Sequence, residues 1–233
     1  ENIKEIKKND YSFFEIEARN FVIETIKNNF NKIKKIKILE VGPGFGDSVL
    51  NFAKLGANVI AIDISKKSLN VIKEKVKKHN LINKIKLIKM DANHLKFRNN
   101  YFDVIFIQTT LMHLNYIKVA IECKRVIKRN GLIIFFEPLD DNLLIRYYRN
   151  LFSKFKETKP NYLRFKDILK ISKNFKKFKT KGFYLISFLS LVFRNSFLYN
   201  LISKSLKKFE IALIKLFPKL EKYCWVNISI YRK

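Results

Sequence analysis

One nine-residue stretch constrains the fold of this chain more than any other feature. Residues 38–46 (ILEVGPGFG) form an apolar run that passes directly into three closely spaced glycines. This pattern is typical of a buried strand, a tight turn and a helix start, because glycine lacks a Cβ and adopts positive φ easily. The next apolar run ends at Asp63, where sheets of this kind hold a ribose through its hydroxyls. The residues therefore predict a ligand site made of backbone N–H groups and a carboxylate.

Apolar runs alternate with helix-like stretches along the rest of the chain. Strands are expected at residues 36–41, 58–62, 85–90, 102–108, 132–137 and 223–231, and a sixth in chain order within the apolar stretch 182–192. Helices are expected at residues 11–30, 47–55, 65–79, 115–128, 142–155, 163–173 and 197–216, and a turn at residues 130–131. Such alternation indicates a Rossmann-like, doubly wound α/β fold with helices on both faces of a mostly parallel sheet.

The net charge of +28 from 48 Lys and Arg against 20 Asp and Glu has two readings. It invites an anionic partner, nucleic acid or a membrane surface. Lys, Asn and Ile are all abundant, however, which the codon bias of an AT-rich genome also produces, and we favour this plainer reading. The excess is densest in residues 151–233, with 20 basic against 4 acidic residues.

Cysteine usage and hydropathy limit where in the cell the protein is expected to be. Cys123 and Cys224 match no zinc or redox spacing, so we expect a reducing, cytoplasmic location and no metal site. The longest apolar run, residues 183–193, is shorter than the roughly 20 residues that a membrane-spanning helix needs, so no transmembrane segment is expected. No signal peptide is visible, although the chain starts at Glu1 rather than Met, which leaves an upstream piece open.

The glycine spacing separates two classes of nucleotide ligand. Dinucleotide folds use G-x-G-x-x-G to admit a pyrophosphate, whereas Gly42, Gly44 and Gly46 form G-x-G-x-G with Glu40 two residues earlier. This pattern resembles the first motif of class I S-adenosylmethionine (SAM) dependent methyltransferases. SAM carries an amino-acid end and a sulfonium instead of a phosphate, so a shorter turn beside an acid suits it. A tight turn without a ligand is the alternative.

The resemblance continues over residues 36–138 in the family's order and spacing. It implies that Asp63 holds both ribose hydroxyls of SAM and that Asp91 accepts a hydrogen bond from the adenine amino group. Ile64 and Ala92 would sandwich the adenine. Both carboxylates also suit plainer roles, Asp63 as a helix cap and Asp91 as a turn residue.

Two further residues follow from the fourth strand. The resemblance places Gln108 near the methionine end of SAM, although it also suits an ordinary buried amide. His113 sits where many small-molecule members carry a histidine, and it is the candidate general base. A packed or capping histidine is the plainer alternative. His94 is expected to be a loop residue.

We expect one methyltransferase domain over residues 1–233. It would comprise an N-terminal helical lid (1–30), a SAM-binding core (31–138) and a substrate-side part (139–233) that matches the family only in outline, with a sixth strand, a helical insertion and an antiparallel last strand in a seven-stranded sheet. Asp140 and Asp141 follow the fifth strand, and we favour a helix cap through Asp141 over a cation site or a base.

The implied reaction is attack of a nucleophile on the SAM methyl, which releases S-adenosylhomocysteine. Residues 107–113 (IQTTLMH) lack the proline and stacking aromatic with which base-modifying enzymes hold a flipped base. This favours a small-molecule, glycan-precursor or lipid-like acceptor. An RNA-modifying enzyme and a non-catalytic SAM-binding partner subunit are the alternatives.

Two apolar features belong to the substrate side. One is a set of aromatic residues that would form a lid or simply pack in the core: Tyr11, Phe13, Phe14, Tyr147 and Tyr148. The other is the helix at residues 197–216, which pairs an apolar face with four lysines. Such a helix suits a lipid or membrane-surface contact. It equally suits packing on the sheet with a solvated outer face, which we favour.

Overall fold

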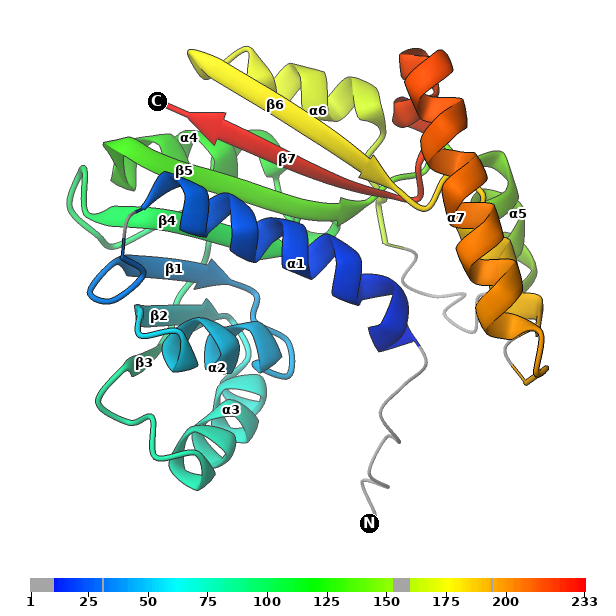
Figure 1. Ribbon diagram of the computed structural model, residues 1–233. Coiled ribbons are helices and arrows are strands. Elements are labelled where there is room, and N and C mark those ends of the chain that lie inside the picture. Colours follow the sequence, from blue (N-terminus) through cyan, green and yellow to red (C-terminus); the bar gives the residue numbers. More distant parts are fainter. Residues whose placement is uncertain (1–10, 31, 153–159, 194) are drawn as a thin grey trace.

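A computed structural model gives the fold of the chain (Figure 1). It describes residues 11–30, 32–152, 160–193 and 195–233, with only the backbone of residues 11–15 and 151–152. Within this part of the chain, seven strands form one sheet in the order β3-β2-β1-β4-β5-β7-β6. The strands are β1 (Lys37–Val41), β2 (Asn58–Asp63), β3 (Ile85–Lys89), β4 (Phe102–Gln108), β5 (Ile127–Pro138), β6 (Lys177–Phe183) and β7 (Val226–Arg232).

Strands β1 to β5 are parallel, and β7 is antiparallel to both of its neighbours, β5 and β6. The carboxyl ends of the parallel strands therefore share one edge of the sheet. The strand order reverses between β1 and β4, which is the position at which open α/β sheets bind their ligands. The expected mostly parallel sheet with an antiparallel last strand is confirmed.

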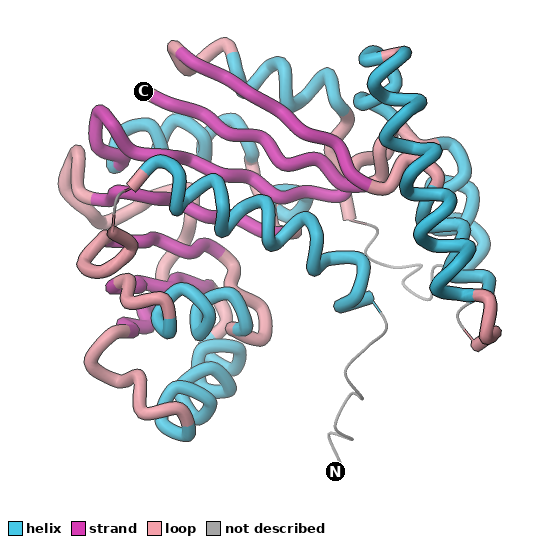
Figure 2. Tube along the Cα trace, viewed as in Figure 1, coloured by secondary structure: helices cyan, strands magenta, loops and turns pink. Residues whose placement is uncertain are grey.

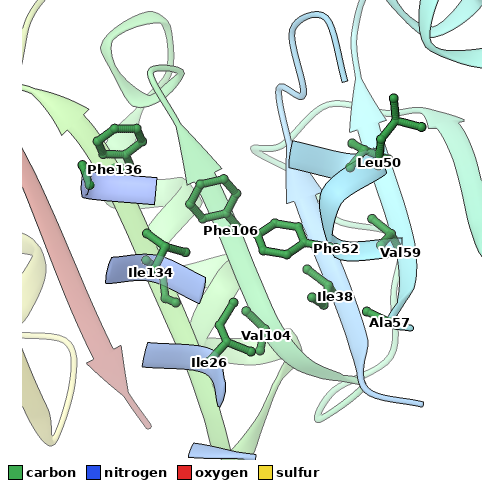
Figure 3. Packing of buried hydrophobic residues seen from close by; sticks show 14 of the residues in the cluster. Ile26, Ile38, Leu50, Phe52, Ala57, Val59, Val104, Phe106, Ile134 and Phe136 are labelled. Carbon is green, nitrogen blue, oxygen red and sulfur yellow. The ribbon is translucent and has the colours of Figure 1, made fainter. Parts of the chain in front are cut away.

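Helices cover both faces of the sheet and bury two separate apolar clusters. Helices α1 (Tyr11–Asn29), α2 (Asp47–Lys54) and α3 (Lys66–Lys78) pack on one face, and α4 (Tyr116–Val126) and α6 (Phe165–Ser172) on the other. Figure 3 shows the first cluster, in which Ile26 of α1 and Phe52 of α2 reach the strands. The rings of Phe52 and Phe106 meet edge to face with centroids 5.4 Å apart, an arrangement that aromatic pairs prefer.

The predicted position of the sixth strand, within residues 182–192, was wrong. Residues 187–193 form a 3-10 helix, η2 (Ser187–Phe193), and the strand β6 lies earlier, at Lys177–Phe183. Because β6 is the edge strand, Lys177, Lys179 and Lys181 are exposed, so the strand carries alternating charge instead of the continuous apolar run that marks a buried strand.

Three smaller boundaries also differ from expectation. Residues 130–131 lie inside β5, where the register against β4 shifts between Phe102 and Val104, so the expected turn is a strand irregularity. Helix α4 is correspondingly shorter than expected. Helix α5 spans Leu143–Phe152, and the remainder of the expected helix at 142–155 lies outside the described residues.

The C-terminal part adds helices beyond the carboxyl edge of β5 and β6, and the tube in Figure 2 follows its path. Helix α7 (Tyr199–Leu216) packs against η2 and the 3-10 helix η3 (Pro218–Tyr223). Of the α7 residues only Glu210 is buried, so the expectation that the apolar face of this helix packs on the sheet was wrong. None of the described helices is both long and apolar enough to cross a membrane.

Candidate functional site

A cavity of about 630 Å³ lies at the carboxyl ends of β1 to β4, within the size range of small-molecule sites. It brings together all of the cofactor-binding and catalytic candidates predicted from the sequence, except Gly46. The lining includes Glu40, Gly42, Gly44, Asp63, Ile64, Asp91, Ala92, Gln108 and His113. These residues are far apart in the chain, and the parallel sheet gathers them because each follows or ends a strand.

The glycine turn opens the first side of the cavity. Gly42 has φ 64° and donates its N–H to the Ile62 carbonyl at 3.0 Å. A Cβ on Gly42 would lie 2.4 Å from the Thr110 side chain, whereas a Cβ on Gly44 would meet nothing within 4 Å. Backbone at Gly44 is therefore open to a ligand. Gly46 instead lies against Ile72 of α3 and caps α2.

Glu40 lies in the buried part of β1, one residue before the end of the strand, and its carboxyl group is unusual. Its Oε1 accepts a hydrogen bond from the Ser48 hydroxyl, while its Oε2 is buried without a hydrogen-bond partner among the described residues. Burial raises the pKa of Glu40 to about 8, against the lowering effects of Ser48 and of the positive charge of Arg19. A cationic ligand in the cavity would supply the partner that Oε2 lacks.

Asp63 and Asp91 are each held by backbone directly after their strands. Asp63 Oδ1 accepts the Ser65 N–H at 2.7 Å. The Ser65 hydroxyl caps α3, so Ser65 rather than Asp63 is the N-cap. Asp91 Oδ1 accepts the Asn93 N–H at 2.8 Å, and this bond is the main cause that lowers the Asp91 pKa. Both carboxylates are therefore oriented before any ligand arrives.

The loop after β4 is fixed by a carboxyl group that the sequence analysis missed. Glu137, in β5, accepts the N–H groups of Thr110 and Leu111 through Oε1, both at 3.0 Å. Burial raises the pKa of Glu137 to about 8. The Thr110 hydroxyl lies 3.2 Å from the Gly42 carbonyl, so the network joins the ends of β1, β4 and β5. It also sets the position of His113, which is exposed at the rim of the cavity.

Other lining residues carried no signal in the sequence. Arg19 reaches the cavity from α1, and the exposed Phe45 lies inside the glycine turn. Ser48, Met90, Asn93, Thr109 and Leu114 complete much of the remaining wall. Arg19 belongs to an amphipathic helix without a motif, so only the fold could place it.

Asp141 does not cap the helix that follows it, and that prediction was wrong. Asn142 Oδ1 accepts the Ile145 N–H at 3.1 Å at the start of α5, whereas Asp141 Oδ2 accepts the Phe165 N–H at 2.6 Å at the start of α6. Asp140 forms ion pairs at 3.4 to 3.9 Å with Arg146, Arg149 and Arg164. The described residues contain no group of three or more His, Cys, Asp or Glu side chains that could hold a metal ion.

The aromatic lid does not form around this cavity from the side chains that the structure describes. Tyr147 and Tyr148 are exposed on α5 and are not among the lining residues. The side chains of Tyr11, Phe13 and Phe14 lie outside the described part of the chain. His94 lies in the loop after β3, as expected, with Nε2 2.9 Å from Lys118 Nζ and outside the cavity wall.

Comparison with known proteins places this geometry in a family. A model described as a methyltransferase domain matches residues 39–135. The ubiquinone biosynthesis O-methyltransferase of Pelagibacter ubique is 34% identical over 120 residues, 51% of this chain and 48% of that protein. The ubiquinone/menaquinone biosynthesis C-methyltransferase UbiE of Vibrio campbellii is 29% identical over 114 residues, 46% of this chain and 44% of that protein. The chain spans about half the length of the curated relatives it matches.

The fold extends the similarity beyond the matched residues. Phosphoethanolamine N-methyltransferase 2 of Haemonchus contortus, solved with phosphomonomethylethanolamine and S-adenosylhomocysteine, superposes with a TM-score of 0.63 at 17% identity. The superposition covers 92% of this chain and 52% of that chain. The sheet order, the glycine turn and the family match agree, and residues 39–135 belong to the methyltransferase domain of class I SAM-dependent methyltransferases.

Proposed function

We propose that the protein is a SAM-dependent methyltransferase that acts on a small-molecule, glycan-precursor or lipid-like acceptor and releases S-adenosylhomocysteine. The observation that carries the proposal is the convergence of a glycine turn and carboxylates from successive strands on one cavity. In open α/β sheets this edge is the ligand site.

The residues present fit SAM by their chemistry. The cavity volume of about 630 Å³ suits a ligand of this size. Asp63 and Asp91 offer acceptors for the ribose hydroxyls and the adenine amino group, and Ile64 and Ala92 offer apolar contact to the adenine. The unpartnered Oε2 of Glu40 fits an ammonium group, and Arg19 in the same wall fits a carboxylate.

In the proposed reaction the side chains bind, orient and move a proton. When bound, SAM supplies a methyl group that its sulfonium has already activated. Glu40 and Gln108 orient the amino-acid end so that the methyl faces the acceptor. His113 at the rim accepts a proton from a hydroxyl acceptor. No metal is required for these steps.

We further propose a division of labour along a single domain. Residues 31–138 hold SAM, the N-terminal helix closes one side of the cavity through Arg19, and residues 139–233 serve the acceptor. The loop 107–113 carries no stacking aromatic or proline for a flipped base. The similar proteins described above are methyltransferases of ubiquinone and menaquinone biosynthesis and of phosphoethanolamine, which supports a small acceptor. Cytoplasmic location is part of the same proposal.

Calorimetric titration with SAM tests the site assignment. Asp63→Ala is expected to weaken SAM binding by about 100-fold, because two hydroxyls lose a charged acceptor. The matched control is Glu74→Ala, which removes an exposed carboxylate of α3 that pairs with Lys77 and is not part of the cavity wall. Unchanged SAM affinity in Asp63→Ala would refute the assignment.

Methyl-labelled SAM incubated with the purified protein and a lysate of its source tests the reaction. Protein-dependent label in the small-molecule or lipid fraction is expected. Label in RNA would replace the proposed acceptor with nucleic acid. SAM binding without any transfer would instead favour a non-catalytic SAM-binding partner subunit, in which His113 does not act as a base.

A further inference from the structure

The C-terminal helices expose large apolar side chains to solvent. We call this region the α7 surface, and it consists of the exposed residues Leu189, Val192, Phe193, Phe197, Leu198, Leu201, Phe209, Leu216 and Phe217. Phe197 is 93% exposed, Val192 80% and Leu216 73%. Single exposed apolar residues are ordinary, but here they gather on two elements, α7 and η2, that pack against each other, and such a group marks a candidate interaction site.

The helical geometry of α7 sets three of these apolar residues apart from its lysines, while the exposed Ile211 lies on the lysine side. At 100° per residue, Leu201, Phe209 and Leu216 lie within about 80° of one another around the helix axis. A second set of exposed residues follows directly on one side of that stripe, within about 60° of Leu201: Lys204, Lys208 and Lys215. An outward apolar stripe bordered by lysines is the pattern of a helix that lies in a membrane interface.

Helix α7 itself exposes no acidic side chain, although Glu17 and Glu24 of α1 lie in one hollow with Lys204 and Lys207. Glu210 is the sole acidic residue between residues 168 and 220, and it is buried. Its carboxylate accepts the N–H groups of Tyr184, Ile186 and Ser187 at 3.1, 2.9 and 2.8 Å. The negative charge of α7 is thus used to fix η2 beneath it, and the exposed charge of this helix is entirely positive.

The combination of apolar and basic residues indicates which kind of partner binds the α7 surface. A second copy of the chain would set the lysines of one α7 against those of the other, which is repulsive. A nucleic acid would neutralise the lysines but would leave the apolar stripe in water. An anionic bilayer satisfies both, because its headgroups attract lysines and its acyl boundary accepts apolar side chains. We propose that the α7 surface docks the protein on an anionic lipid membrane.

Flotation with lipid vesicles tests this docking on the full chain. Binding to vesicles of phosphatidylcholine mixed with phosphatidylglycerol is expected to exceed binding to phosphatidylcholine alone by about tenfold or more at low salt, and to fall as salt rises. Equal binding to both vesicles, or no binding to either, would overturn the proposal.

Two triple variants separate the apolar and the charged contributions. Leu201→Ser/Phe209→Ser/Leu216→Ser and Lys204→Gln/Lys208→Gln/Lys215→Gln are each expected to lower binding to the mixed vesicles by about tenfold or more. The matched controls keep nearly full binding: Val71→Ser/Ile82→Ser/Ile121→Ser and Lys66→Gln/Lys67→Gln/Lys73→Gln, whose residues are exposed elsewhere. An unchanged thermal midpoint by circular dichroism shows that each variant is folded. Equal losses in the controls would contradict a specific surface.

Two measurements without vesicles test the alternative partners of the α7 surface, a second copy of the chain and a nucleic acid. Sedimentation velocity would overturn membrane docking if it showed a dimer that the apolar triple variant abolishes. Binding to RNA that the lysine triple variant loses and the apolar triple variant retains, together with weak vesicle binding, would equally overturn it in favour of a nucleic acid. A monomer with vesicle binding that needs both sets of residues supports the proposal.

Discussion

In the cavity at the carboxyl ends of β1 to β4, acidic side chains line the wall and are held by neighbouring groups, whereas in α7 the acidic side chain is buried and the basic ones face solvent. Asp63 and Asp91 accept directional bonds from Ser65 and Asn93. The lysines of α7 border an apolar stripe, and of these lysines only Lys207 forms an ion pair among the described residues, with Glu17. Directional bonds suit one ligand in one pose, while loosely held charge suits a fluid, extended partner.

The largest expected effect compares one aromatic residue from each region. Phe106 in β4 is 2% exposed and Phe209 in α7 is 59% exposed. Phe106→Ala is expected to lower the free energy of unfolding by about 3–5 kcal/mol, because it leaves a cavity in the core. Phe209→Ala is expected to change it by about 0.5 kcal/mol or less. Urea denaturation measures both, and a large loss in Phe209→Ala would mean that α7 is part of the core.

A second prediction concerns the buried carboxyls Glu40 and Glu137. Burial raises the pKa of each from 4.5 to about 8. Between pH 5 and pH 8 the unfolded chain releases protons that the folded chain keeps, so the free energy of unfolding falls as pH rises. The fall is expected to be on the order of 3 kcal/mol for each of the two carboxyls.

Urea denaturation across this pH range measures the free energy of unfolding of Glu137→Gln and of the unmodified protein. The difference between their pH dependences gives the contribution of Glu137 alone. Gln keeps a carbonyl acceptor for the Thr110 and Leu111 N–H groups but cannot ionise, so the variant should show a flatter pH dependence. Glu74→Gln, an exposed control, should not. A slope in Glu137→Gln equal to that of the unmodified protein would contradict the shifted pKa.

Substitutions at two glycines of the turn test which part of the turn is packed against protein and which part faces the cavity. Gly42→Ala adds a methyl group against Thr110 as well as backbone strain, so it should lower the free energy of unfolding by about 2 kcal/mol. Gly44→Ala meets open space and should cost only the strain of positive φ, about 1 kcal/mol. Its added methyl should weaken SAM binding by calorimetry. Equal stability losses would mean that Thr110 moves aside.

The smallest expected effect is a proton count. If an ammonium group meets Glu40 Oε2, SAM binding ionises Glu40 and releases up to about one proton near pH 7. Calorimetry in buffers of different ionisation enthalpy measures this number. Glu40→Gln should bring it close to zero. An unchanged release in Glu40→Gln would assign the proton to another group.

The cavity was predictable where residues end apolar runs. Asp63, Asp91 and Gln108 each close a recognisable strand, and the parallel sheet brings such ends to one edge. Arg19 and Glu137 were not predictable as wall and support, because one comes from an amphipathic helix and the other acts through backbone N–H groups that no side-chain pattern records. The roles assigned to the predicted residues toward SAM stay predictions.

The C-terminal part was predictable only as a set of helices and a last strand. The continuous apolar run at 183–193 suggested a buried strand, although it forms η2 over the Glu210 carboxylate. Periodicity cannot separate a buried strand from another short buried segment. The same ambiguity hid the exposure of α7, because an apolar helical face does not reveal whether another surface covers it.

The place of β7 between β5 and β6 has a consequence for how the chain is made. β6 joins the sheet only through β7, and about forty positions separate the end of β6 from the start of β7. At a synthesis rate of about 5–20 residues per second, β6 waits roughly 2 to 8 seconds for its partner. During that interval β5 presents an open apolar edge, so a nascent chain of this protein is expected to depend on chaperones at this stage more than at any other.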